Sequence, residues 1–204
     1  MRSKTAIILV ILTILVFISL NFDFQIVRYV NLVRNNILDD FFFGIAFVSS
    51  EIIILFVLTS LFLWQERKRK WILPLWLSLG FSALVSFIIK ILIQRERPYQ
   101  LGLISVIPSL EKASHLVWDF SFPSFHAMMA FSAIPILSKE FPKFRYIWII
   151  FACLIAFSRL YFGLHFLSDI LAGAVIGYLI GAFMVHLEDR DNLWERAYKK
   201  IFRR

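Results

Sequence analysis

The stretch SRLYFGLHFLSDILAGAVIGYLIGAFMVHL, residues 158–187, joins a polar cluster to a long apolar run. From residue 166 to residue 187 the chain is long enough to cross a bilayer as a helix, which takes about 17 to 25 apolar residues. The cluster before it holds a serine, an arginine, a histidine and an aspartate, and ionisable residues are costly within hydrocarbon. The stretch therefore predicts a membrane helix that begins beside a polar site.

The composition of the whole chain favours a membrane protein. Of its 204 residues, 60% are hydrophobic and 18% are charged, whereas soluble domains are about 45–50% apolar and about 25% charged. A net charge of +8 does not by itself indicate a nucleic-acid partner, because basic residues in membrane proteins mostly record topology. No nucleic acid is expected as a partner. The single cysteine, Cys153, allows no intramolecular disulfide.

The apolar runs predict an all-α fold, a single membrane domain built as a six-transmembrane-helix bundle. The expected spans lie at about 5–20, 41–64, 71–93, 126–137, 146–157 and 166–187. An amphipathic interfacial helix is expected between the first two spans, where apolar residues recur at helical spacing, at Ile26, Val30, Val33 and Ile37. Residues 188–204 are predicted to form an amphipathic cytoplasmic tail.

The six predicted spans divide the 22 lysines and arginines unequally between two sides. The termini and the loops on their side carry fifteen of these residues, and the opposite loops carry seven. The side richer in lysine and arginine is normally cytoplasmic. We therefore expect a multi-pass protein of the cell membrane with both termini in the cytoplasm.

The third run ends in KILIQRERP, residues 90–98. Lys90 and Arg97 are seven residues apart, about two helical turns, so they would share one face of a helix that Pro98 ends. Lys90 lies among apolar neighbours, where a cation is unusual. Arg95, by contrast, fits a side chain that extends from a helix end toward water.

The fourth run begins FPSFHAMM, residues 122–129. Pro123 and Ser124 suit a helix start, where Ser124 could cap the helix. The free backbone N–H groups of a first helical turn bind anions. His126 would then lie beside the bound anion.

His165 and Asp169 are four residues apart and would share one helix face. The carboxylate could accept a hydrogen bond from one imidazole nitrogen and leave the other nitrogen free as a nucleophile. Taken alone, the pair could instead be a structural ion pair. The predicted topology favours a catalytic role over a structural one, because the candidate polar residues all fall at the outer ends of the spans. These residues are Lys90, Arg97, Ser124, His126, Arg159, His165 and Asp169. Three cations, a helix start and two imidazoles on one face predict a reactive phosphate site.

Three motifs in order resemble the signature of the type 2 phosphatidic acid phosphatase superfamily. They are Lys-x6-Arg-Pro at residues 90–98, Pro-Ser-x-His at 123–126 and Ser-Arg-x5-His-x3-Asp at 158–169. Each motif is weak alone, but the ordered set is specific. Within the superfamily, the length of the chain and the outward-facing site are similar to those of small bacterial phosphatidylglycerophosphate phosphatases.

The resemblance implies a role for each site residue. His165 would attack phosphorus and form a phosphohistidine, Asp169 would orient it, and His126 would protonate the leaving oxygen and then activate water. The phosphate oxygens would be bound by Lys90, Arg97, Ser124, Arg159 and the N–H of Phe125. The resemblance also implies that no metal ion or other cofactor is needed.

The function implied is a membrane lipid phosphate phosphatase that hydrolyses the phosphomonoester of phosphatidylglycerophosphate at the outer membrane face. An undecaprenyl pyrophosphate phosphatase, or a broad-range lipid phosphatase that includes phosphatidic acid, remains the alternative. Anionic membrane lipids are the expected partners. A lipid-phosphate transporter or receptor is less favoured, because binding alone would not need the two histidines and the aspartate.

Some residues stay without a firm assignment. Phe125 stands where the superfamily commonly has glycine, so it bears on the breadth of substrates rather than on the reaction. Glu51, within the second run, could line the path of the lipid or have a structural role. Gly173, Gly177 and Gly181 form a stripe that allows close helix packing. We expect this stripe to contact another span of the same chain, and the protein to be a monomer rather than a homodimer.

Overall fold

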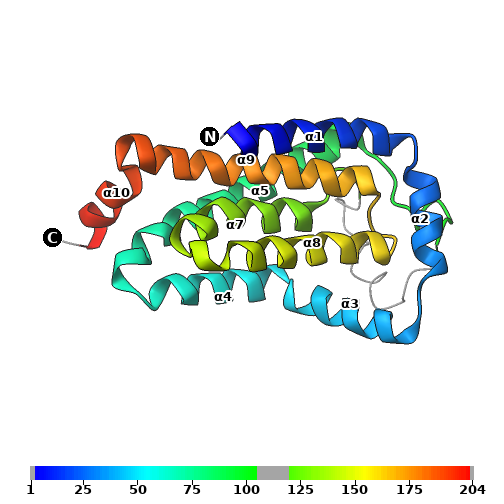
Figure 1. Ribbon diagram of the computed structural model, residues 1–204, viewed down its shortest axis with the longest axis horizontal. Helices are drawn as coiled ribbons and strands as arrows, with labels where there is room; N and C mark the ends of the chain where they lie inside the picture. Colours follow the sequence, from blue (N-terminus) through cyan, green and yellow to red (C-terminus); the bar gives the residue numbers. More distant parts are fainter. Residues whose placement is uncertain (1–2, 105–119, 203–204) are drawn as a thin grey trace.

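The computed structural model describes residues 3–104 and 120–202, and all regular structure in these residues is helical (Figure 1). The elements are α1 (Ser3–Leu20), α2 (Asp23–Leu32), α3 (Asn36–Val48), α4 (Glu51–Leu63), η1 (Glu66–Trp71), α5 (Ile72–Ile93), α7 (Phe125–Glu140), η2 (Pro142–Phe144), α8 (Arg145–Tyr161), α9 (Leu167–Asp191) and α10 (Leu193–Phe202). The all-α expectation is thus confirmed.

Helices α7 and α9 pack closely at the centre of the bundle, as the glycine stripe predicts. A Cβ atom added at Gly177 would overlap the carbonyl oxygen of Met128, and one added at Gly181 would overlap that of Ser132. A Cβ atom at Gly173 would likewise meet the carbonyl oxygen of Ser124. The stripe therefore serves packing within the chain, and it fixes the start of α9 against the start of α7.

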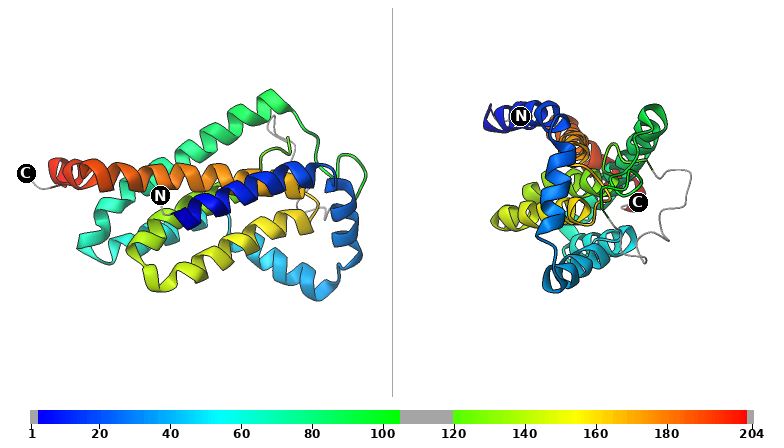
Figure 2. Two further views of the ribbon diagram at one scale, coloured as in Figure 1. Left: turned by 45° about the horizontal axis from the view of Figure 1, so that its top comes forward. Right: turned by 90° about the vertical axis from the view of Figure 1, so that its right-hand side faces the viewer.

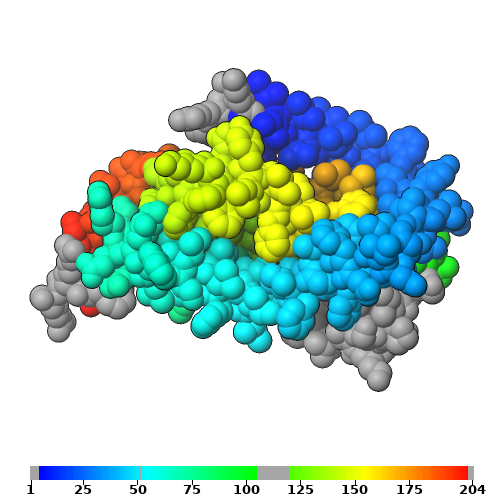
Figure 3. Space-filling view, turned by 60° about the horizontal axis from the view of Figure 1, so that its bottom comes forward, coloured from blue at the N-terminus to red at the C-terminus, as the bar shows by residue number. Residues whose placement is uncertain are grey.

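The other long helices surround this central pair. Helices α1 and α5 contact α9, and α5 and α8 contact α7; seen end-on, the outer helices lie around α7 and α9 (Figure 2). The largest apolar cluster among the described residues joins η1, α5, α7 and the end of α9 through Trp71, Leu75, Met129, Ile136 and Met184. On another face, α8 lies beside α3 and α4 (Figure 3).

Apolar side chains also cover the outside of the bundle. Phe17 on α1, Phe56 on α4 and Leu92 on α5 are each more than 60% exposed. An exposed apolar surface spread over several helices is what a lipid-facing protein requires. Within residues 3–104 and 120–202, three helical segments are long and apolar enough to cross a membrane: Glu66–Ile93, Pro142–Tyr161 and Leu167–Asp191.

Two bent helix pairs could raise the number of spans to five, but six spans stay a prediction. Helices α1 and α2 bend by 85°, and α3 and α4 bend by 61°. The second span expected at 41–64 is not one continuous helix, because Ser50 has an extended backbone, with φ −60° and ψ 144°, that separates α3 from α4. Its crossing of the membrane stays a prediction. The fourth expected span is α7, whose 16 residues give a length of about 24 Å.

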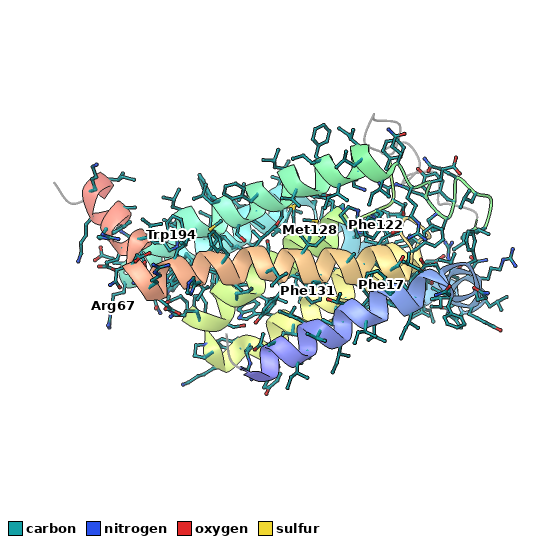
Figure 4. All side chains as sticks on the ribbon, turned by 90° about the horizontal axis from the view of Figure 1, so that it is seen from above. Phe17, Arg67, Phe122, Met128, Phe131 and Trp194 are labelled. Atoms are coloured by element: carbon teal, nitrogen blue, oxygen red, sulfur yellow. The ribbon has the colours of Figure 1, made fainter. Side chains whose placement is uncertain are left out.

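The two predicted amphipathic segments form helices, although their place at a membrane interface stays a prediction. Helix α2 ends at Leu32, so Ile37 falls on α3 and is exposed, while Val27 is fully buried. In the tail, the indole nitrogen of Trp194 donates to the carbonyl oxygen of Met184 at 2.7 Å. This bond holds α10 against the end of α9, where Figure 4 shows Trp194.

Both termini lie toward the end of the bundle that is away from α2 (Figure 1). At the α2 end, four segments meet: the end of α5, the start of α7, the end of α8 and the start of α9. These are the segments that carry the three sequence motifs. The structure thus gathers at one end the residues that the predicted topology placed together.

Candidate active site

The segment between α8 and α9 is a tight hairpin. Gly163 has φ +67°, a left-handed conformation that glycine adopts without strain. The N–H groups of Leu164 and His165 both donate to the carbonyl oxygen of Arg159, at 2.9 and 3.2 Å. The hairpin therefore folds His165 back toward Arg159 at the end of α8.

His165 lies in the middle of the site, and its side chain is almost fully buried. Its Nε2 atom is 3.5 Å from a terminal nitrogen of Arg97. Its Nδ1 atom is 3.7 Å from Oδ2 of Asp169, which is too long for a hydrogen bond. Among the described residues Nδ1 has no hydrogen-bond partner. The expected hydrogen bond from His165 to Asp169 is therefore not formed, although the two groups are neighbours.

The carboxylate of Asp169 is instead held by three other donors. It accepts from the backbone N–H of Phe166 at 2.7 Å, from a terminal nitrogen of Arg95 at 2.8 Å and from the hydroxyl of Ser121. The bond from Phe166 closes the first turn of α9. Asp169 is fully buried, so its charge depends on these partners.

The assignment of Arg95 as a cation that reaches toward water is wrong. Its guanidinium binds Asp169 and Asp23, each at 2.8 Å, and lies over the ring of Phe166 at 4.1 Å from the centroid. Helix α5 ends at Ile93, with Gln94 in a left-handed conformation, so the chain turns before Arg95. Lys90 and Arg97 consequently do not share a helix face, and Pro98 does not end the helix.

Each of the three predicted phosphate-binding cations is already oriented by the protein. The ammonium of Lys90 donates to the carbonyl oxygens of Phe120 and Ser121. The remaining two are guanidinium groups. Arg97 donates to the carbonyl oxygen of Leu164 at 3.0 Å. Arg159 donates to the hydroxyl of Ser49 at 2.9 Å.

The start of α7 has the features of an anion site. Ser124 precedes the helix with an extended backbone, and its N–H donates to the carbonyl oxygen of Asp169 at 3.0 Å. Its hydroxyl is buried and has no hydrogen-bond partner among the described residues. Phe125 packs against the apolar cluster around Trp71 and edge-on to His126 at 5.7 Å.

Burial and positive charge keep His165 neutral. Burial lowers the pKa of His165 well below its usual value, and the positive charges of Arg97 and Lys90 lower it further. His126 and Arg159 act in the same direction. A neutral imidazole at physiological pH keeps the lone pair that a nucleophile needs.

Four residues that support the predicted site, either directly or through Arg95, were missed by the sequence reasoning: Asp23, Ser49, Ser121 and Ser168. Their partners lie between 48 and 145 residues away along the chain. No short spacing could have revealed these contacts. The sequence offered one sign of such a contact, which is the acidic residue Asp23 between the apolar residues Phe22 and Phe24.

In residues 3–104 and 120–202, no three His, Cys, Asp or Glu side chains lie together as metal ligands would. Helix α4 begins at Glu51, but the side chain of Glu51 lies outside the described part, so its role stays open.

Comparisons with known proteins agree with the motifs. Residues 71–193 match the sequence model of the PAP2 superfamily. The chain is 30% identical over 134 residues to the undecaprenyl-diphosphatase of Sulfolobus acidocaldarius, which covers 64% of this chain but only 61% of that protein. It is also 30% identical over 162 residues to phosphatidylglycerophosphatase B of Bacillus subtilis, which covers 73% of this chain and 74% of that protein.

A solved structure has the same fold. It is the crystal structure of a transmembrane PAP2-type phosphatidylglycerolphosphate phosphatase from Bacillus subtilis, with a TM-score of 0.70 and 23% sequence identity. The match covers 90% of this chain and 96% of that one. The whole helical arrangement, and not only the motif-bearing end, is therefore shared.

Proposed function

Since the chain belongs to the PAP2 superfamily, we propose that it is a membrane lipid phosphatase that hydrolyses the phosphomonoester of phosphatidylglycerophosphate through a phosphohistidine. The observation that supports this most strongly is the setting of His165. A buried, neutral imidazole has its Nε2 atom 3.5 Å from Arg97, with two further cations at the same end of the bundle. This combination suits a nucleophile that attacks an anionic phosphate.

In the proposed first step, Nε2 of His165 forms a bond to phosphorus as the bond to the lipid oxygen breaks. His126 gives its proton to that oxygen, which leaves as an alcohol. The positive charge that develops on His165 is stabilised by Asp169, 3.7 Å from Nδ1. In the second step, His126 takes a proton from water, and the water oxygen displaces His165 from phosphorus.

The proposed phosphate cradle uses groups that the protein has already placed. Arg97, Lys90 and Arg159 are each fixed by a hydrogen bond, so they need little reorganisation to bind the non-bridging oxygens. The buried hydroxyl of Ser124 has no other partner among the described residues. Phe125 is the first residue of α7, so its N–H has no acceptor within the helix.

We propose that the site faces outward and that both termini are cytoplasmic. The excess of lysine and arginine on the side of the termini supports this orientation. The site lies at the opposite end of the bundle from the termini (Figure 1). The use of the glycine stripe between α7 and α9 supports a monomer, because the stripe is not available for contact with a second copy.

The second candidate substrate is undecaprenyl pyrophosphate. The relative from Sulfolobus acidocaldarius, whose name refers to that reaction, is as similar in identity as the phosphatidylglycerophosphatase from Bacillus subtilis. Both substrates present a terminal phosphate to the same cradle and keep their apolar chains in the bilayer. The difference between them lies in the leaving group, which is an alcohol in one and a phosphate in the other.

The test is phosphate release by purified protein from phosphatidylglycerophosphate, undecaprenyl pyrophosphate and phosphatidic acid. We expect release that a chelator does not abolish and that His165→Ala eliminates. Preference for undecaprenyl pyrophosphate by at least tenfold in kcat/KM would select the second candidate. Binding of these lipids without any release would reject the enzyme and favour a transporter or receptor.

A further inference from the structure

Arg95 connects two carboxylates that belong to distant parts of the chain. One terminal nitrogen contacts Asp169 on α9, and the other contacts Asp23 on α2, each at 2.8 Å. Both aspartates are fully buried, whereas the side chain of Arg95 is 21% exposed. A guanidinium with two opposed N–H edges is suited to bridge two carboxylates in this way.

Ser168 completes the connection between the two aspartates. Its backbone N–H donates to Asp23 at 3.1 Å, and its hydroxyl also contacts Asp23. The same hydroxyl accepts from Arg95 at 2.7 Å. Asp23 therefore binds the chain one residue before Asp169, and it fixes the first turn of α9 as well as the guanidinium.

Apolar packing holds α2 in the place that this network requires. Val27 is fully buried in a cluster with Phe166, Ile170 and Leu160. The ring of Phe24 lies 5.5 Å from that of Phe166. The segment around Phe166 is thus enclosed by α2 on one side and by the guanidinium of Arg95 on another.

The position of Asp169 depends on residues that its own sequence motif does not specify. The carboxylate has no hydrogen bond to His165, so the imidazole does not hold it in place. Its position is set by Ser121, Phe166 and Arg95. Arg95 alone among these three supplies a positive charge, and a buried carboxylate without such a partner is strongly disfavoured.

We infer that Arg95 and Asp23 are positioning residues, which hold Asp169 charged and correctly placed behind the nucleophile His165. Helix α2 is then part of the support of the active site rather than only a surface helix. The inference rests on the proposed function, since it assigns Asp169 to the stabilisation of a charged His165. It adds two residues that are not among the specified positions of the three motifs.

The experiment compares kcat, KM and thermal unfolding for Asp23→Asn, Arg95→Gln, the double variant and the milder Ser168→Ala. We expect kcat to fall about 10- to 100-fold in the first two variants, as for other residues that orient a reactive group. KM should change less than threefold, because neither residue contacts the phosphate. The double variant should lose no more than the worse single one, because both act through Asp169.

Two controls separate positioning from stability. Lys70 also bridges two carboxylates, Glu188 at 2.8 Å and Glu195 at 3.0 Å, at the other end of the bundle. Lys70→Gln should lower the unfolding temperature and leave kcat unchanged. Arg95→Lys should recover part of the kcat lost in Arg95→Gln, because it restores the charge but can bridge the two carboxylates less well.

The outcomes are distinct from those that test the proposed function. If the wild type releases no phosphate from any lipid, the proposed function fails. If the wild type is active, unchanged kcat in Asp23→Asn and Arg95→Gln would overturn the inference. The inference would also be overturned if the loss of kcat in the double variant equalled the product of the losses in the two single variants. If Arg95→Gln does not fold, the test uses Asp23→Asn and Ser168→Ala instead, and unchanged kcat in both would overturn the inference.

Discussion

His165 shows at the scale of one residue how burial and charge prepare a group for reaction. Its pKa is lowered by burial first and by Arg97 next. Protonation would remove the nucleophile, so activity should fall only when the pH drops through this lowered pKa. We predict that the acid limb of kcat/KM lies below pH 6.5, the ordinary pKa of histidine.

The variant Arg97→Gln tests the cause of this shift. It removes a positive charge 3.5 Å from Nε2 of His165, so the pKa of His165 should rise. The acid limb of kcat/KM should therefore move to higher pH, in addition to the loss of activity from weaker phosphate binding. A pH profile measured for both proteins with one substrate checks this. An acid limb that stays in place or moves to lower pH would disprove the electrostatic explanation.

Ser49 is a second residue whose role follows from one contact. Its hydroxyl accepts from Arg159 at 2.9 Å, and hydrogen bonds to charged groups contribute about 1.5–3 kcal/mol. Ser49→Ala should leave Arg159 less well oriented and lower kcat/KM roughly tenfold. The neighbouring Ser50 has no side-chain bond that caps α4, so Ser50→Ala is the matched control. Equal activity in both variants would show that Arg159 needs no such support.

At the scale of the elements, the packing of α9 on α7 sets the distance between Asp169 and the start of α7. Gly177→Ala should force the helices apart, because the new Cβ atom would overlap the carbonyl oxygen of Met128. We expect a loss of stability of about 1–3 kcal/mol and a lower kcat. Thermal unfolding in detergent and phosphate release measure the two effects.

Gly80 on α5 provides the control for this prediction. No atom lies within 4 Å of a Cβ atom added there, and alanine is a better helix former than glycine by about 1 kcal/mol. Gly80→Ala should leave stability unchanged or raise it slightly. Equal losses in the two variants would mean that the effect comes from helical glycines in general and not from close packing.

The elements also show how far the sequence determines the fold. Long apolar runs and the glycine stripe predict α5, α8, α9 and the contact of α9 with α7, because these features depend on local composition and period. The break between α3 and α4 was missed, because residues 41–64 were treated as one apolar run although Ser49, Ser50 and Glu51 interrupt it, and the helix is broken at Ser50. The expectation that the helix continues from Ile93 as far as Pro98 is wrong, because Gln94 takes a left-handed conformation, which is uncommon for residues other than glycine.

The candidate site, like the fold, could be predicted from the sequence only in part. The motif residues were predicted to gather at one end, and they do, because the end of α5, the start of α7, the end of α8 and the start of α9 lie at the same end of the bundle. The partners that hold them could not be predicted. Asp23 contacts Arg95, 72 residues away, and Ser168, 145 residues away, and such contacts depend on tertiary packing. Arg95 was misassigned for this reason.

At the scale of the whole molecule, the proposed orientation predicts which positions can be labelled from outside the cell. In a Cys153→Ser background, a cysteine is introduced either by Leu101→Cys near the site or by Arg67→Cys at the opposite end. Both positions are exposed, and Figure 4 shows Arg67 at the end that carries α10. A maleimide that does not cross membranes should label Leu101→Cys in intact cells and Arg67→Cys only after permeabilisation. The reverse pattern would place the site in the cytoplasm.

The central claim is that His165 carries the phosphoryl group during hydrolysis of a lipid phosphate. The most direct measurement is rapid quenching of the enzyme during turnover of a lipid labelled with ³²P in its terminal phosphate. The account predicts protein-bound label that is stable to base and labile to acid, as phosphohistidine is, and that is absent from His165→Ala. Phosphate release by the wild type without any such label, or equal labelling of His165→Ala, would contradict it.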